Sequence, residues 1–170
     1  MRQFIAFAVA LLPLLMRGGA TDTQLLPRGF TADKVVVHKQ RRALHLLKGT
    51  DTVKTYQISL GKNSIGPKTR EGDGRTPEGT YKIDWRNPKS AFHLSLHISY
   101  PDSSDVARAK QLGFSPGGMI MIHGLTNGLR WIGKQHLLSD WTDGCIAVTS
   151  EEIEELWRCI PDGTTIILLP

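Results

Sequence analysis

Cys145 is the residue of this chain best suited to nucleophilic chemistry. It follows Gly144 in the stretch DWTDGCIAV, and the chain has one other cysteine, Cys159. A thiol becomes a strong nucleophile when a base or a positive charge favours its thiolate, and a backbone bend beside it presents N–H groups to a developing oxyanion. Gly144 permits such a bend because glycine adopts dihedrals that are closed to other residues. The sequence therefore predicts a cysteine nucleophile beside an oxyanion-binding loop.

Six histidines are candidates for the base that would activate this thiol. His123 ends the apolar stretch GGMIMIHG and is followed by a glycine, so it is predicted at the end of a strand that another segment approaches closely. His136 is nearer to Cys145 in the sequence and is the rival base. The other histidines lie in or beside predicted strands and have no adjacent loop glycine. His123 is therefore the first candidate for a general base.

Neither a metal site nor a disulfide is predicted. The chain contains no HxxxH or CxxC pair, so we expect no metal ligand set. Cys145 precedes a predicted helix and Cys159 lies about three turns along it, which separates the two by roughly 15 Å at a rise of about 1.5 Å per residue. A disulfide tolerates a Cα separation of under about 7 Å, so we expect no bridge between these cysteines.

The predicted helix lies near the C-terminus. Thr149 is placed as its N-cap, with Glu152 completing a capping box. Apolar residues then repeat at three- and four-residue spacing, which is typical of a helix with one buried face. Pro161 and Gly163 end it.

Most of the remaining chain is predicted to form strands, because short apolar-rich runs alternate with turn residues. The first three runs suggest an antiparallel meander. The Gly-, Pro- and charge-rich stretch GKNSIGPKTREGDGRTPEGTY is predicted as a long functional loop, and residues 102–112 as a short helix. The predicted strands are Lys34 to His38, Ala43 to Leu47, Val53 to Leu60, Tyr81 to Trp85, Leu94 to Tyr100, Met119 to His123 and Thr164 to Leu169.

The first residues have the layout of a secretory signal. Arg2 supplies a positive charge, residues 4–16 form an apolar run, and residues 18–20 are small residues suited to a cleavage site. The run is too short to span a bilayer, which needs about 20 apolar residues. We therefore predict a signal peptide over residues 1–20, no stable membrane insertion beyond it, and export to the periplasm or cell envelope.

The mature chain is predicted to be only weakly basic. The full sequence has 21 Lys and Arg against 16 Asp and Glu, and removal of Arg2 and Arg17 with the signal would leave 19 basic residues. These are scattered, without the basic stripe and interleaved aromatics of a nucleic-acid surface. We expect no nucleic-acid partner, one domain of ordinary size and a monomer.

Three motifs in order resemble a known family. MIHG, followed 22 residues after its histidine by DGCIAV, resembles the active-site signature of the L,D-transpeptidase catalytic domain, a YkuD-type family of cell-wall enzymes. The segment RTPEGTY, from Arg75 to Tyr81, is similar to the T-P-x-G-x-[FY] element of such domains. The resemblance implies a catalytic domain over residues 33–170. Its expected fold is mainly β, a sandwich or barrel with one C-terminal amphipathic helix followed by a last strand.

The resemblance implies acyl transfer on peptidoglycan stem peptides. Cys145 matches the nucleophile, which attacks a tetrapeptide donor before its terminal D-alanine, and His123 matches the general base and acid. The carbonyl of Gly124 would orient the imidazole, and the backbone amides of Asp143, Gly144 and Cys145 match the oxyanion hole. The resulting thioester would pass to an acceptor amine or to water, with no metal or organic cofactor.

Further candidates for substrate contacts lie in loops expected to border the cleft. Trp131 and Trp141 bracket the segment before the nucleophile and are predicted either to form a flap or to anchor one to the core. Basic side chains in these loops would pair with stem-peptide carboxylates. The candidates are Arg70, Arg75, Arg130, Trp131, Lys134, Trp141 and Thr142.

Two positions depart from the family pattern. Asp143 stands where a histidine commonly precedes Gly-Cys, and Ala147 stands where an arginine or asparagine commonly follows. An ionised Asp143 would raise the pKa of the Cys145 thiol unless its side chain points away. Three functions stay open: an L,D-transpeptidase; an L,D-carboxypeptidase or amidase that uses water with the same thioester; and a catalytically silent peptidoglycan-binding domain.

Overall fold

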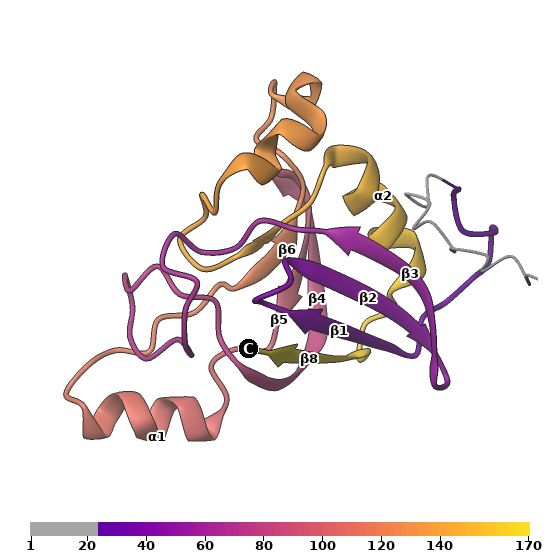
Figure 1. Ribbon diagram of the computed structural model, residues 1–170. Helices are drawn as coiled ribbons and strands as arrows, with labels where there is room; N and C mark the ends of the chain where they lie inside the picture. The colour runs from indigo at the N-terminus through magenta and orange to yellow at the C-terminus, as the bar shows by residue number, and fades with distance from the viewer. Residues whose placement is uncertain (1–23) are drawn as a thin grey trace, which may run out of the picture.

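The computed structural model of the protein describes residues 24–170, and eight β-strands form one sheet within them (Figure 1). The predicted signal peptide over residues 1–20 lies outside the described residues. The strands are β1 (Lys34–His38), β2 (Ala43–Lys48), β3 (Asp51–Gln57), β4 (Gly79–Ser90), β5 (His93–Ile98), β6 (Met121–His123), β7 (Ile146–Ala147) and β8 (Thr165–Leu169).

The strand order is β3-β2-β1-β8-β4-β5-β6-β7. The first three strands form the predicted antiparallel meander, and β8 inserts parallel to β1. β4 is long and irregular: its first half pairs with β8 and its second half with β5, across two register shifts. Bulges of this kind bend a sheet, so β4 connects the strands around β8 to the strands around β5.

The two ends of the strand order meet through the segment that follows β3. Ser59 and Ala147 exchange two backbone hydrogen bonds, and Gly61 forms a parallel bridge with Thr142. This pairing explains why the predicted strand Val53 to Leu60 is shorter in the structure: β3 ends at Gln57, and the following residues pair with β7 instead of continuing along β2. The predicted mainly β, L,D-transpeptidase-like sandwich or barrel is confirmed.

The hydrophobic core is formed by apolar side chains of the strands together with those of one helix. Alternate residues of β1, such as Val35 and Val37, are fully buried, as a strand with one face in the core requires. Helix α2 (Ser150–Cys159) adds Ile153 and Leu156 to the same cluster. Its capping box is formed by Thr149 and Glu152 as predicted, and β8 follows it.

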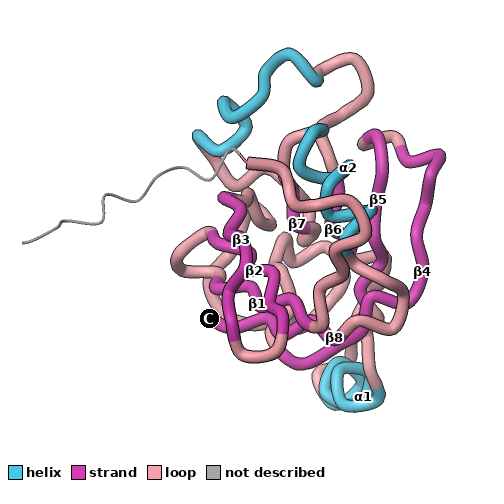
Figure 2. The backbone as a smooth tube through the Cα atoms, turned by 90° about the vertical axis from the view of Figure 1, so that its right-hand side faces the viewer, coloured by secondary structure: helices cyan, strands magenta, loops and turns pink. Residues whose placement is uncertain are grey.

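Two further helical segments lie at opposite ends of the molecule (Figures 1 and 2). Helix α1 (Ser103–Gln111) falls within the short helix predicted over residues 102–112. The 3₁₀ segment η1 (Arg130–Leu138) was not predicted. Gly133 has a positive φ of 47° inside it, so the segment has no continuous helical period that a sequence pattern would reveal. No helix within residues 24–170 is long and apolar enough to cross a membrane.

Candidate active site

Strands β6 and β7 bring His123 and Cys145 to one face of the sheet. They are parallel neighbours, with Ile122 opposite Ile146 and His123 opposite Ala147. The two isoleucines are fully buried in the core. Because side chains alternate along a strand, His123 points to the other face, and so does Cys145, which directly precedes Ile146. The predicted base and nucleophile therefore lie on the same face of two adjacent strands.

The imidazole of His123 is held in one tautomer. Its Nδ1 lies 2.7 Å from the carbonyl oxygen of Gly124, which only accepts, so Nδ1 carries the hydrogen and Nε2 keeps its lone pair. The rings of Phe92 and Trp141 pack against it with centroids 4.4 and 5.6 Å away. Burial lowers the pKa of His123 to about 4, against a smaller opposing effect of the Gly124 hydrogen bond. The ring is therefore neutral at pH 7, with a free acceptor nitrogen.

The thiol of Cys145 is also neutral in the resting structure. Its Sγ donates to the carbonyl oxygen of Met119 at 3.6 Å. Burial raises the pKa of Cys145, and the charge of Asp143 adds to that effect, while the Met121 N–H and the Lys68 ammonium oppose it. The thiol must turn from Met119 to pass its proton to an imidazole, a rearrangement common in ligand-free sites.

A tight bend precedes the nucleophile. Gly144 has a φ of 135°, and a Cβ at this position would lie 2.7 Å from the carbonyl oxygen of Arg75, so only glycine fits. The Thr142 hydroxyl accepts from the Gly144 N–H at 3.2 Å and donates to the Cys145 carbonyl at 2.7 Å. Among residues 24–170, nothing accepts from the backbone N–H groups of Asp143 and Cys145. Within the described residues, those two amides therefore have no hydrogen-bond acceptor.

The two family departures differ in their surroundings. The Asp143 side chain is 88% exposed and pairs with Lys62 at 2.9 Å, so it points into solvent. Ala147 is fully buried opposite His123. The Asp143 carboxylate therefore acts on the thiol from a solvated position, where screening weakens it.

A buried ion pair in the predicted functional loop, which sequence reasoning did not identify, supports the bend. The Asp73 carboxylate accepts from Lys68 Nζ at 2.8 Å and from the Arg75 N–H at 3.0 Å. Burial raises the pKa of Asp73, but these donors and two further backbone N–H groups outweigh it and hold the pKa at about 2. No local pattern marks Lys68 as buried, because its 4% exposure arises from a contact made by the loop. The loop holds the Arg75 carbonyl against Gly144.

Arg70 and Arg75 border a small polar recess. It has a volume of about 290 Å³ and is also lined by Asn63 and Phe114. The Arg70 guanidinium stacks on the Phe114 ring at 4.9 Å, and Arg75 makes a long 3.4 Å contact with the Pro67 carbonyl. Both guanidiniums keep donors free for an anionic group, since an arginine carries five N–H donors.

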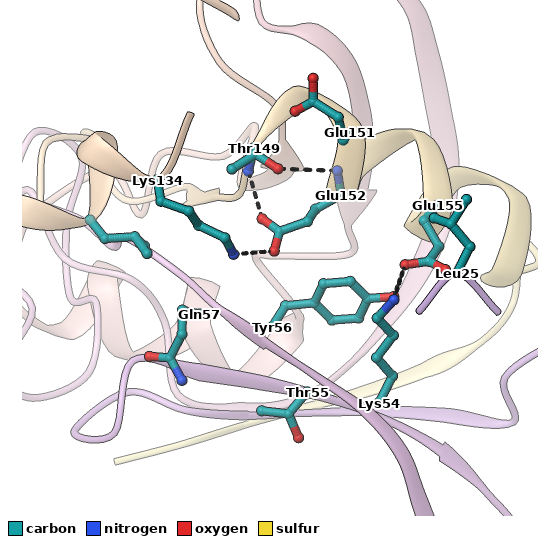
Figure 3. Close-up of a pocket in the computed structure, with 11 residues that line it drawn as sticks. Leu25, Lys54, Thr55, Tyr56, Gln57, Lys134, Thr149, Glu151, Glu152 and Glu155 are labelled. Atoms are coloured by element: carbon teal, nitrogen blue, oxygen red, sulfur yellow. Dashed lines mark hydrogen bonds and ion pairs between the residues drawn. The ribbon is translucent and has the colours of Figure 1, made fainter. Parts of the chain in front are cut away.

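Arg130 and Lys134 are engaged elsewhere. Arg130 pairs with Glu151 at 2.6 Å and with Glu154 at 2.9 Å, and Lys134 pairs with Glu152 (Figure 3). These contacts tie η1 to the first turns of α2. Another candidate on η1, Trp131, is 76% exposed. Trp141 contacts the catalytic histidine candidate, whereas these three residues of η1 face the helix or solvent.

A pocket with a volume of about 480 Å³ lies beside α2, and neither Cys145 nor His123 lines it (Figure 3). Its inner wall is the buried pair of Lys54 and Glu155, 2.7 Å apart, joined by the Tyr56 hydroxyl at 2.9 Å. These groups satisfy one another, so the wall has the character of structural packing. Across residues 24–170 no group of three or more His, Cys, Asp or Glu side chains is arranged to hold a metal ion. Both cysteines are free thiols, and Cys159 is buried in the core.

On this mainly β fold, a cysteine and a histidine of fixed tautomer lie on the same face of the sheet. This is the arrangement of enzymes in which a histidine base activates a cysteine nucleophile. The family model YkuD, described as the L,D-transpeptidase catalytic domain, matches residues 32–168. The protein therefore belongs to this family, as the sequence motifs indicated.

Two curated relatives carry the same family name. The chain is 26% identical over 133 residues to "Putative L,D-transpeptidase YafK" of Escherichia coli (strain K12), which covers 74% of this chain and 46% of the relative. It is 24% identical over 138 residues to "Putative L,D-transpeptidase YqjB" of Bacillus subtilis (strain 168), which covers 79% of this chain and 69% of the relative. The chain thus spans about half the length of YafK.

Solved structures show the same fold. The helical cell shape determining protein Pgp2 from Campylobacter jejuni superposes with a TM-score of 0.62 at 23% identity, over 88% of this chain and 51% of that chain. Bd1075 from Bdellovibrio bacteriovorus gives a TM-score of 0.55 at 23% identity, over 84% of this chain and 49% of the other.

Proposed function

We propose that this protein is a cysteine-dependent L,D-transpeptidase that acts on peptidoglycan stem peptides in the periplasm or cell envelope, with residues 1–20 as its export signal. One observation carries the proposal. The hydrogen bond from His123 Nδ1 to the Gly124 carbonyl leaves the Nε2 lone pair free on the face of the sheet that also bears Cys145. Membership of the L,D-transpeptidase catalytic domain family supports the choice of reaction.

Acylation begins when the Cys145 thiol turns towards the imidazole. Nε2 of His123 takes the thiol proton as Sγ attacks the carbonyl carbon that precedes the terminal D-alanine. The Asp143 and Cys145 N–H groups donate to the oxyanion, since Gly144 uses its own N–H to hold the bend. The C–N bond then breaks, and the imidazolium gives its proton to the leaving amine of D-alanine.

The thioester is resolved by a second nucleophile. An acceptor amine loses a proton to His123 Nε2 as its nitrogen attacks the thioester carbon, and the C–S bond breaks to leave a new amide and the Cys145 thiolate. The imidazolium returns its proton to that thiolate. Water in place of the amine would give an L,D-carboxypeptidase by the same steps.

Two further groups would hold the donor stem. Arg75 presents its guanidinium to the polar recess beside the Gly144 bend, where a stem carboxylate would meet it. Trp141 covers one edge of His123 and excludes water from the imidazole. Thr142 acts indirectly by fixing the bend on both sides.

Intact-protein mass spectrometry tests this proposal. The purified protein is incubated with disaccharide-tetrapeptide, with and without an acceptor stem, beside Cys145→Ala and the matched control Cys159→Ala. We expect a Cys145-dependent adduct and loss of D-alanine in both the unmodified protein and Cys159→Ala. A dimeric product in the presence of acceptor supports transpeptidation, whereas D-alanine release without dimer assigns a carboxypeptidase. Unchanged substrate and no adduct would refute the proposed chemistry.

A further inference from the structure

A recess that neither Cys145 nor His123 lines has no role in the steps above. It has a volume of about 260 Å³ and lies between η1 and the segment that follows β6. Leu125, Ile132 and Trp141 give it apolar walls, and no Lys, Arg, Asp or Glu side chain lines it. A pocket of this composition suits an uncharged group, because a carboxylate would be desolvated without a cation to compensate.

Two buried polar atoms of this recess lack partners. His136 Nε2 and Trp141 Nε1 make no hydrogen bond to any part of the chain from residue 24 onward, although the solvent barely reaches either atom. His136 is only 5% exposed as a whole. Native proteins rarely leave such groups unpaired, and those that do are often found at sites where a ligand completes the pairing.

The hydrogen bonds of Ser59 show which nitrogen of His136 carries the ring hydrogen. The Ser59 hydroxyl donates its single hydrogen to the His136 carbonyl at 2.9 Å. The same oxygen lies 3.2 Å from His136 Nδ1 and must accept there, so Nδ1 carries the ring hydrogen. Burial lowers the pKa of His136, which keeps the ring neutral. Nε2 is therefore an acceptor, whereas Trp141 Nε1–H is a donor.

The recess adjoins the proposed reaction centre through one shared residue, Trp141. Trp141 lines it and also packs edge-on against His123 at 5.6 Å. Leu125, in its wall, follows His123 by two residues, while Cys145 stands beside Met121 on the other side.

We propose that this recess binds an uncharged amide group of the peptide substrate, which donates its N–H to His136 Nε2 and accepts from Trp141 Nε1–H. An amide carries one donor and one acceptor, which matches the two unpaired atoms, whereas a carboxylate has no hydrogen for His136. This inference rests on the proposed function and adds a positioning role for His136, which sequence reasoning had considered as a rival base.

Matched variants separate recognition from packing. Trp141→Phe removes the N–H donor and keeps an aromatic ring. His136→Asn removes Nε2 and keeps a donor near the Ser59 hydroxyl, while His136→Gln restores an amide oxygen near the position of Nε2. With disaccharide-tetrapeptide we expect KM to rise about tenfold in Trp141→Phe and His136→Asn, the value of one lost hydrogen bond. In the two His136 variants we expect kcat to change little, and we expect His136→Gln to recover most of the loss.

Reaction of Cys145 with methyl methanethiosulfonate, which carries no amide, serves as the control and should keep its rate in the two His136 variants. Unchanged KM in both Trp141→Phe and His136→Asn would refute the subsite and leave the recess to water. An equal loss in the thiosulfonate reaction would also overturn it, because the variants would then act through general disruption of the site.

A binding measurement separates this inference from the reaction itself. The Cys145→Ala protein is titrated with disaccharide-tetrapeptide, and the indole N–H resonance of Trp141 is followed by NMR. We expect a downfield shift that saturates with peptide. An unmoved resonance would refute the subsite even if the unmodified protein acylates normally. Conversely, a shifted resonance in Cys145→Ala together with no Cys145 adduct in the unmodified protein would contradict the proposed reaction and support the subsite.

Discussion

At pH 7, Cys145 and His123 should rest as a neutral pair, and not as a thiolate–imidazolium ion pair. Burial lowers the pKa of His123 to about 4 and raises that of Cys145 from 9.0. The two pKa values therefore differ by more than about five units, which makes the isolated proton transfer unfavourable by at least about 7 kcal/mol. Attraction between the new charges offsets about 4 kcal/mol at a separation of ~4 Å and an effective dielectric constant of about 20. The ion pair therefore lies at least about 3 kcal/mol uphill, which corresponds to under about 1% of molecules.

The thiolate can be measured directly by its ultraviolet absorbance as the pH is raised. The difference between the unmodified protein and Cys145→Ser isolates this thiol, because Cys159 is present in both. We expect no difference signal below about pH 8, and a rate of alkylation by iodoacetamide that rises about tenfold per pH unit below the thiol pKa. The imidazole of His123 should stay neutral in NMR spectra down to about pH 5, given its pKa of about 4.

A difference signal equal to one thiolate per protein at pH 6 to 7, with a protonated His123, would refute this reasoning. Burial would then be outweighed by a stabilisation of the charged pair that the surroundings of the two groups do not contain. The control is Asp143→Asn, which removes an exposed charge and should shift the thiol titration only slightly downwards.

Three further outcomes follow from the same contacts. Gly144→Ala should fold but lower the rate of acylation at least about 100-fold, because its Cβ would lie 2.7 Å from the Arg75 carbonyl and displace the bend; adduct formation followed by mass spectrometry checks this, and a near-native rate would contradict it. Lys54→Met should destabilise the protein by about 3–5 kcal/mol in urea unfolding, because Glu155 would be buried without its partner, and Lys54→Met/Glu155→Leu should recover part of that loss. Between pH 6.5 and about 4 the unfolded state binds more protons at His123 than the folded state does, so stability should fall as the pH is lowered through this window, by up to about 3 kcal/mol; urea unfolding at several pH values should show a smaller decline in His123→Gln.

Local sequence was sufficient for most elements. The capping box at Thr149 and Glu152 marks the start of α2, because its hydrogen bonds join residues three apart. Short apolar-rich runs separated by turn residues predicted the strands, since strands of this fold bury apolar side chains in the core. Glycine next to Cys145 and His123 identified the two turns at which the fold was expected to place its reactive side chains, and family motifs supplied their pairing.

Other features depend on contacts between segments far apart in the chain. η1 follows from Gly133 and from ion pairs with α2, so no helical period announces it. Lys68 is buried because the loop folds over it, and the neutrality of Cys145 and His123 comes from the surroundings that tertiary packing supplies. The amino-acid sequence by itself determined which groups are available for chemistry, whereas the tertiary structure decided their protonation and the free atoms of His136. Desolvation and hydrogen bonding depend on every neighbour in space, and those neighbours are set by the closed fold and not by adjacency in the chain.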